Sequence, residues 1–246
     1  MARRLSTRGR FVVFYLLLGA AVGAGIGTFI VLLQRPGPQP PPQWSSWQPV
    51  ASSTSPRLLE IANHVGNEYV APTGDPLVGI KLGGPAIGKS LRAIIIPNKA
   101  NPKTLADFQR FDKDKSVIYL LCGLGKSCRI PGTATQARGT VLRREALELA
   151  LYTFEYMNGI DNVLVFVPPG PGQKKLTNTL FFHRDDLSHN LDNPLRQTLP
   201  YRPPLPGQIK ASEQKTVDSL TASTLYRYVG ILPANGYGNV LVIQRG

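Results

Sequence analysis

The sequence predicts an α+β protein with a single N-terminal transmembrane helix, a proline-rich stalk and one mixed α+β domain outside the membrane. An uncharged apolar stretch occupies residues 11–33, and prolines and serines dominate residues 34–56. The remaining residues alternate irregularly between helical and strand patterns without an internal repeat. We therefore divide the chain into a cytoplasmic basic tail (1–10), a transmembrane helix (11–33), a linker (34–56) and an extracytoplasmic domain (57–246).

The apolar stretch at residues 11–33 reads FVVFYLLLGAAVGAGIGTFIVLL and contains neither a charged residue nor a proline. As an α-helix it would be about 34 Å long, slightly more than the roughly 30 Å hydrocarbon core of a bilayer. A buried helix of a soluble domain that is this long and this apolar on every side would be unusual. The pattern therefore predicts a membrane-spanning helix.

The flanking charges predict the orientation of this helix. Arg3, Arg4, Arg8 and Arg10 precede it without a single acid, and only Arg35 follows it closely. Basic residues stay on the cytoplasmic side, which places the N-terminus inside and the domain outside the plasma membrane. A cleaved signal peptide is the alternative, but its apolar region usually spans about 7–15 residues and ends in a small-x-small site. An uncleaved, single-pass signal anchor fits the longer stretch better.

Glycines recur every four residues within the predicted membrane helix, at Gly19, Gly23 and Gly27. Small residues at positions i and i+4 allow two helix backbones to approach closely, which is how helices associate in lipid. The spacing predicts a partner helix, either a second copy or another protein. The alternative is that glycine is simply frequent in membrane helices.

The linker reads QRPGPQPPPQWSSWQPVASSTSP and holds both tryptophans of the chain, Trp44 and Trp47. Its prolines favour an extended polyproline II conformation, in which residues three apart project from the same side. Because exposed indoles are costly, we interpret the two tryptophans as candidates for docking a partner. Docking onto the protein's own domain or onto the membrane interface is the alternative.

The chain is strongly basic, with a formal net charge of +13 and a pI near 10.0. The four N-terminal arginines contribute four of these charges, which leaves +9 beyond the helix. A basic surface outside the cell favours anionic envelope polymers or lipid headgroups as partners, in addition to the bilayer itself. Nucleic acid would be the usual partner of such a chain inside a cell, but the predicted topology argues against it.

Within the domain, hydrophobic periodicity and turn residues predict the regular elements. The longest helix is expected to end before Asn158-Gly159 and to expose Glu145, Glu148, Tyr152 and Glu155. Asn235-Gly236 is a strong hairpin signal. We expect helices at 57–71, 139–157 and 212–224, and strands at 77–82, 91–96, 117–122, 162–169, 177–182, 225–232 and 239–244.

Residues 83–90, GGPAIGKS, match the G-x-x-x-x-G-K-S pattern of a phosphate loop. That chemistry needs a long helix starting at the lysine, so that its first amides face the phosphates. The following residues, LRAIIIP, instead form a strand-like run that ends at a proline, and the predicted topology places the loop outside the cell. We therefore expect a glycine-rich hairpin loop and assign no nucleotide partner.

The two cysteines, Cys122 and Cys128, flank a short GLGKS segment at the end of a predicted strand. In an extracytoplasmic domain such a pair typically forms a disulfide, which closes a small loop and stabilises the fold by about 2 kcal/mol. Redox-active pairs usually have two residues between the cysteines, and two thiols do not complete a zinc site.

The densest group of chemically active residues is HRDDLSH, with His183, Asp185, Asp186 and His189. Histidines with carboxylates can bind zinc or perform acid–base catalysis, but acids following a strand also cap ordinary helices. We therefore assign no metal and no cofactor. The leading hypothesis is a non-enzymatic, membrane-anchored interaction or scaffold protein of the cell envelope. The alternative is a membrane-tethered extracytoplasmic hydrolase that uses the His183–His189 region.

Overall fold

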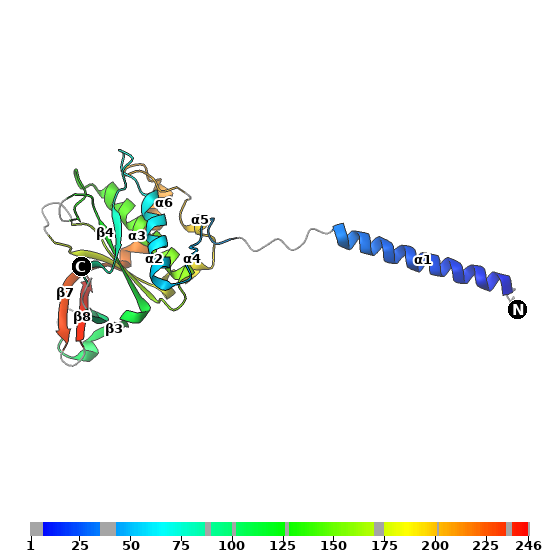
Figure 1. The fold of residues 1–246 in the computed structure, drawn as a ribbon, viewed down its shortest axis with the longest axis horizontal. Helices are drawn as coiled ribbons and strands as arrows, with labels where there is room; N and C mark the ends of the chain where they lie inside the picture. Colours follow the sequence, from blue (N-terminus) through cyan, green and yellow to red (C-terminus); the bar gives the residue numbers. More distant parts are fainter. Residues whose placement is uncertain are drawn as a thin grey trace. The chain divides into compact units, whose positions relative to one another are not determined.

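The computed structural model describes residues 7–34, 43–86, 90–99, 102–125, 128–169, 175–200, 202–234 and 238–245 (Figure 1). The chain divides into two units, Met1–Pro42 and Gln43–Gly246. The first unit contains one long helix, α1 (Thr7–Gln34). Taken over the described residues, no helix combines the length and the apolar character needed to cross a membrane.

The second unit is built on a mixed sheet of eight strands within the described residues. The order across the sheet is β1-β4-β5-β6-β7-β8-β2-β3, with β4–β5 and β2–β8 parallel and the other neighbours antiparallel. The predicted α+β class is therefore confirmed. The strands are β1 (Gly79–Leu82), β2 (Leu91–Pro97), β3 (Phe108–Asp112), β4 (Ser116–Cys122), β5 (Asn162–Phe166), β6 (Asn178–His183), β7 (Leu225–Ala234) and β8 (Gly238–Arg245).

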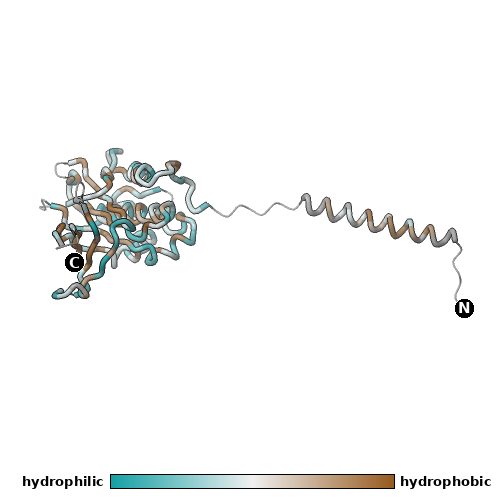
Figure 2. The backbone as a smooth tube through the Cα atoms, turned by 60° about the horizontal axis from the view of Figure 1, so that its bottom comes forward, coloured by the Kyte–Doolittle hydropathy of each residue, from teal (hydrophilic) through white to brown (hydrophobic). Residues whose placement is uncertain are grey.

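The helices of this unit pack against one half of the sheet. The longest helix, α3, connects the parallel strands β4 and β5, as a parallel pair requires. The α-helices are α2 (Thr54–Glu68), α3 (Gln136–Tyr156), α4 (Ser188–Leu191), α5 (Leu195–Thr198) and α6 (Ala211–Thr221). Hydrophobic segments gather mainly in the interior of this unit and hydrophilic segments mainly at its periphery (Figure 2).

The main core lies between α2, α3 and the face of β4, β5 and β6 that the helices cover. Alternate strand residues point into it, as the two-residue period of a strand requires. Its fully buried side chains include Tyr119, Val163, Val165, Leu180 and Phe182 from the strands, and Ile61, Leu147, Leu151 and Phe154 from the helices.

A second core fills the opposite face of the sheet, because the sheet curls over itself. The rings of Phe111 on β3 and Phe181 on β6 lie 4.6 Å apart between centroids, although β7, β8 and β2 separate these strands in the sheet. Similarly, Phe166 on β5 contacts Tyr228 on β7 at 5.2 Å. Strands therefore cover strands on this face, and it needs no helices.

On the helix-covered side, the described helices leave the strands β7, β8 and β2 open. Leu225 of β7 pairs with Leu180 of β6, which faces the helices, so Leu225 points to the helix side. Arg227, two residues further along β7, points to the same side. The cross-strand pairs between β7 and β8 and between β8 and β2 identify the residues of β8 and β2 that lie on this side. Figure 1 shows the helices gathered beside β4, with the β7–β8 ribbon extending beyond them.

Two sequence predictions about the domain were wrong. Residues 43–53, assigned to the linker, belong to the compact unit that begins at Gln43. In α3, Glu145, Glu148 and Tyr152 are buried instead of exposed, because α2 and α6 pack against α3 in addition to the sheet. Strand β3 was not predicted, and the Asn235-Gly236 turn lies outside the described residues.

Candidate functional site

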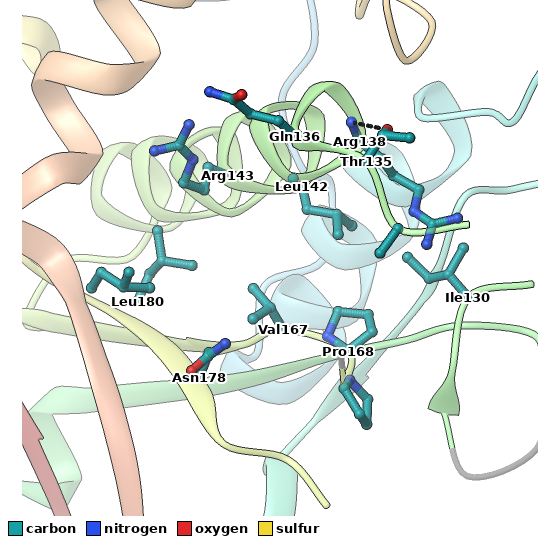
Figure 3. Close-up of a pocket in the computed structure, with 14 residues that line it drawn as sticks. Ile130, Thr135, Gln136, Arg138, Leu142, Arg143, Val167, Pro168, Asn178 and Leu180 are labelled. Carbon is teal, nitrogen blue, oxygen red and sulfur yellow. Dashed lines mark hydrogen bonds between the residues drawn. The ribbon is translucent and has the colours of Figure 1, made fainter. Parts of the chain in front are cut away.

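A cleft of about 460 Å³ lies beneath the first turns of α3, at the carboxyl ends of β4 and β5 (Figure 3). We call it the α3 cleft. Figure 3 shows Leu142 directed from α3 toward Val167 and Pro168, which follow β5. Ile130 and Leu180 close two further sides, so the walls are largely apolar. In sheets with parallel strands, ligands commonly bind at this end, where a helix begins after a strand.

The disulfide loop brings the chain back to the start of α3. Cys122 and Cys128 are bonded, as predicted, and the amide of Gly123 donates to the carbonyl of Cys128 at 3.0 Å. A Cβ atom on Gly123 would lie only 2.3 Å from the backbone carbonyl carbon of Arg129. This close approach of two backbone segments therefore requires glycine, and it places Ile130 at the rim of the cleft.

Helix α3 starts at the cleft because Thr135 caps it. The Thr135 hydroxyl oxygen accepts a hydrogen bond from the amide of Arg138 at 3.2 Å, and the Thr135 carbonyl accepts from Gly139. The guanidinium of Arg138 donates to the Pro131 carbonyl at 2.9 Å. Because a carbonyl carries no net charge, the positive charge of Arg138 stays uncompensated by this bond and attracts anions.

The residues lining the α3 cleft provide binding groups rather than a catalytic set. The second arginine of the lining, Arg143, pairs with Asp218 at 2.6 Å. The remaining polar lining residues include Gln136 and Asn178, and the Thr135 hydroxyl already caps the helix. This combination can hold an apolar or weakly anionic group, but it places no acid–base pair next to a nucleophile.

A second surface lies on the uncovered side of β7, β8 and β2, and we call it the open sheet face. It consists of Ala93, Ile95, Pro97, Phe108, Val229, Leu232, Val240 and Val242, with Arg110 and Arg227. A hollow of about 580 Å³ crosses it. Val242 and Ala93 form a buried floor, whereas Val229 and Leu232 are each 49% exposed.

Two continuous apolar runs in the sequence indicate this surface, although they were used only to predict strands. The run Val240–Ile243 in β8 and the run Ala93–Ile96 in β2 are apolar at every position. Strands covered on only one face usually alternate apolar and polar residues, whereas continuous apolar runs are typical of strands covered on both faces. The second core covers one face of β8 and β2, and in the described chain no helix covers the other.

Positive charge surrounds the open sheet face. Arg110 lies opposite Ile95 in the ladder and Arg227 lies opposite Gln244; both arginines are exposed. Among the described residues neither forms an ion pair. On the same half of the sheet, the Lys99 ammonium lies 2.7 Å from Asp107. The hydrogen bond from Lys99, with further bonds from backbone amides, lowers the pKa of Asp107 to about 2.

The structure does not assemble the predicted histidine group into a site. The His183 ring nitrogen Nδ1 accepts a bond from the amide of Asp185 at 3.3 Å, so His183 caps a short 3₁₀ turn. Asp185, Asp186 and His189 are exposed to solvent. Within the described residues, no cluster of three or more His, Cys, Asp or Glu side chains could hold a metal ion.

Both tryptophans dock onto the domain itself, the alternative that the sequence left open. The Trp47 ring stacks on the His64 ring, and the Trp44 ring packs edge-on against Tyr152 at 5.3 Å. The Ser45 hydroxyl is 2.7 Å from the Tyr152 hydroxyl, and the Tyr156 hydroxyl donates to the Trp47 carbonyl at 2.9 Å. The indoles therefore fasten residues 43–53 to α2 and α3.

A buried ionic network near this contact was not anticipated. Arg144, fully buried on α3, donates to Glu213 of α6 at 2.5 Å and to Glu148 at 2.8 Å. It also contacts the Tyr69 hydroxyl at the end of α2 and the Pro200 carbonyl. The sequence spacing i, i+4 of Arg144 and Glu148 could have indicated their pairing, but neither residue type predicts burial. The network joins three helices and has a structural role.

Two other sequence motifs are only partly described. In the glycine-rich loop, residues 87–89 lie outside the described residues, and Leu91 begins the strand β2 where a phosphate loop would need a helix. Gly19, Gly23 and Gly27 lie in α1, and a Cβ atom added at any of them would meet nothing within 4 Å beyond the helix backbone. Arg3 and Arg4 lie outside the described residues.

Comparisons with models of protein families, with curated proteins and with solved structures found no match to this chain.

Proposed function

We propose that the protein is a membrane-anchored, non-enzymatic interaction protein of the cell envelope. In this proposal the N-terminal helix anchors the chain in the cytoplasmic membrane with its basic tail inside. The domain lies outside and binds a partner through the open sheet face. Helix packing through Gly19, Gly23 and Gly27 would bring a second membrane helix to the anchor.

The support for the anchor comes from the sequence of α1. Residues 11–33 carry no charge and no proline, and arginines dominate only their N-terminal side. The disulfide Cys122–Cys128 adds independent support for the outside location, because disulfides persist in oxidising compartments and are rare in the cytosol.

The observation that carries the binding function is the open sheet face. Val229 and Leu232 expose apolar surface above a buried apolar floor, and exposed apolar patches rimmed by polar residues mark interaction sites. The strands beneath are apolar on both faces, which is typical of strands that become covered. His183 caps a 3₁₀ turn through its ring nitrogen and His189 is exposed, so they give the alternative hydrolase no specific geometric support.

Photo-crosslinking in native membranes tests this proposal with a matched pair of positions. Leu232 on the open sheet face is 49% exposed, and Leu59 on α2 is 48% exposed, so the two side chains are equally available. A photoreactive amino acid at position 232 should form adducts in intact membranes, whereas the same residue at position 59 should not. Equal labelling at both positions, or no adduct at position 232, would reject the open sheet face as the binding surface.

A further inference from the structure

We propose that the open sheet face binds the surface of the bilayer that anchors the chain, with its arginines against anionic lipid headgroups. This inference rests on the proposed membrane anchor and names the partner of the open sheet face. It assigns the exposed apolar residues to the interfacial region of the lipid and the basic residues to the headgroups.

The apolar part of the face has the composition of an interfacial contact. Val229 and Leu232 project from β7, and Pro97 on β2 and Phe108 on β3 also line the hollow. Transfer of such side chains from water to the headgroup–acyl boundary is favourable, and the free energy falls in proportion to the apolar area they bury. Beneath Leu232 the β7 backbone is paired with β8 from Gly230 to Ala234, so this ladder is kept when the face approaches the lipid.

The charged part of the face selects an anionic partner. Arg110 and Arg227 are exposed on opposite sides of the apolar strip and form no ion pair among the described residues. Of the acids in and just before β3, Asp112 is exposed and Asp107 is paired with Lys99 at 2.7 Å. Each arginine near an anionic membrane surface strengthens attachment about fivefold.

The same charges argue against a second copy of the chain as the occupant. A twofold pairing of the open sheet face with itself would bring the exposed arginines of both copies, Arg110 and Arg227, into one interface. Like charges brought together in an interface oppose association. An anionic lipid surface meets both arginines without this repulsion.

The length of the chain keeps the bilayer within reach. Only residues 35–42 separate the end of α1 from the compact unit that begins at Gln43. Fully extended, that stretch spans about 30 Å at most. An anchored domain is therefore held permanently near the lipid surface, so docking becomes an intramolecular step at high effective concentration.

Spin labelling of the full-length protein in lipid nanodiscs tests the inference. The two cysteines of the chain are bonded to each other, so Leu232→Cys and Leu59→Cys each introduce a single thiol for a nitroxide. In discs containing anionic lipid, the label at position 232 should become shielded from a water-soluble nickel relaxant and accessible to oxygen. It should stay exposed to the relaxant in discs of purely zwitterionic lipid, and the label at position 59 should stay exposed in both.

A second variant separates the contribution of charge from that of folding. Arg110→Gln combined with Arg227→Gln removes two exposed charges without disturbing the core, and it should weaken docking about 25-fold, or about fivefold for each arginine. A label at position 232 that stays fully exposed in anionic discs overturns the inference, as does shielding that is equal in both lipids. Failure of the protein to enter nanodiscs would instead reject the anchor. Protein adducts alone at position 232 in native membranes would assign the face to a protein partner and reject the lipid.

Discussion

The Trp47 indole lies flat on the His64 imidazole, with ring centroids 3.9 Å apart and planes 8° apart. This contact fastens the segment that precedes α2 to the helical layer of the domain. The His64 ring nitrogen Nε2 also lies 3.2 Å from the Tyr152 hydroxyl and 4.0 Å from a Glu68 carboxylate oxygen. Protonation of His64 therefore affects how firmly the segment that contains Trp47 is held on the domain.

Acidification should loosen this segment. Burial lowers the pKa of His64 below its usual value of 6.5, so the folded state favours the neutral ring. A lowered pKa stabilises the docked form above pH 6.5, and this stability is lost as the pH falls toward the folded-state pKa. Because Trp44 and Trp47 are the only tryptophans, their emission should shift to longer wavelength between pH 7.5 and pH 5. His64→Phe keeps an aromatic ring without a titrating group, and its emission should not change over this range.

Removing Arg144 should destabilise the domain severely. Arg144→Ala leaves the buried carboxylates of Glu148 and Glu213 without their partner, and breaking a buried ion pair in this way costs about 3–5 kcal/mol. Arg143→Ala is the matched control, because its pair with Asp218 is partly exposed and such pairs contribute about 1 kcal/mol or less. Guanidinium unfolding of the two variants measures the difference, and similar losses in both would contradict the structural role of the network.

Glu145 should make the protein less stable as the pH rises. It is fully buried, and among the described residues neither carboxylate oxygen has a hydrogen-bond partner. Burial, with a smaller contribution from Glu148, raises its pKa well above the ordinary value of 4.5. The folded protein therefore keeps a proton that the unfolded chain loses, and stability falls as the pH rises from about 4.5 toward the folded-state pKa.

The Glu145→Gln variant tests this pH dependence. Glutamine has nearly the same shape and does not titrate, so the variant should match the parent near pH 4 and exceed its stability near pH 8. The gain should be about 1.4 kcal/mol for each unit by which the pKa is raised. Melting temperatures recorded across this range give the comparison, and a difference that is independent of pH would show that Glu145 is ionised in the folded state.

The glycine stripe of α1 gives a separate prediction about association. Gly23→Ile adds volume at the middle of the stripe and keeps the helix apolar, so it should reduce crosslinking to a membrane partner or to a second copy. Val13→Ile lies outside the stripe and serves as the control. Interhelical packing in lipid is modest, about 1–2 kcal/mol where polar pairs have been measured, so one substitution can remove most of the association. Unchanged crosslinking in the Gly23→Ile variant would show that the glycines are incidental.

Much of the fold could be predicted from local patterns, and the errors have physical causes. The predicted strands 91–96 and 117–122 match β2 and β4 within one residue at each end, because continuous apolar runs between turn residues indicate buried strands. Strand β3, FQRFD, was missed because it is short and polar; at the edge of the sheet it buries Phe111 alone. Glu145 and Glu148 were predicted to face solvent, because the periodicity of a helix indicates one apolar face and does not show that other elements cover its polar face as well.

The candidate site was less predictable than the fold. The disulfide followed from the cysteine spacing, and it is present. The open sheet face depends on which strands become neighbours, because Val229, Val242 and Ile95 come together only through the pairing of β7, β8 and β2. The β7–β8 hairpin is local, but the β8–β2 pairing joins segments far apart in the chain, and local sequence patterns do not specify it. Trp44 and Trp47 were assigned to a stalk because the rings they pack against, His64 on α2 and Tyr152 on α3, are brought to them only by the tertiary fold.

The central claim is that the chain is anchored in the membrane with its domain outside the cell. Extraction of membranes at alkaline pH, combined with protease treatment of intact cells or spheroplasts, tests both halves of the claim in one preparation. We predict that the full-length protein stays in the membrane pellet after extraction, and that external protease digests the Gln43–Gly246 domain. Release of the intact chain into the alkaline wash, or full protection of the domain from external protease, would contradict the account.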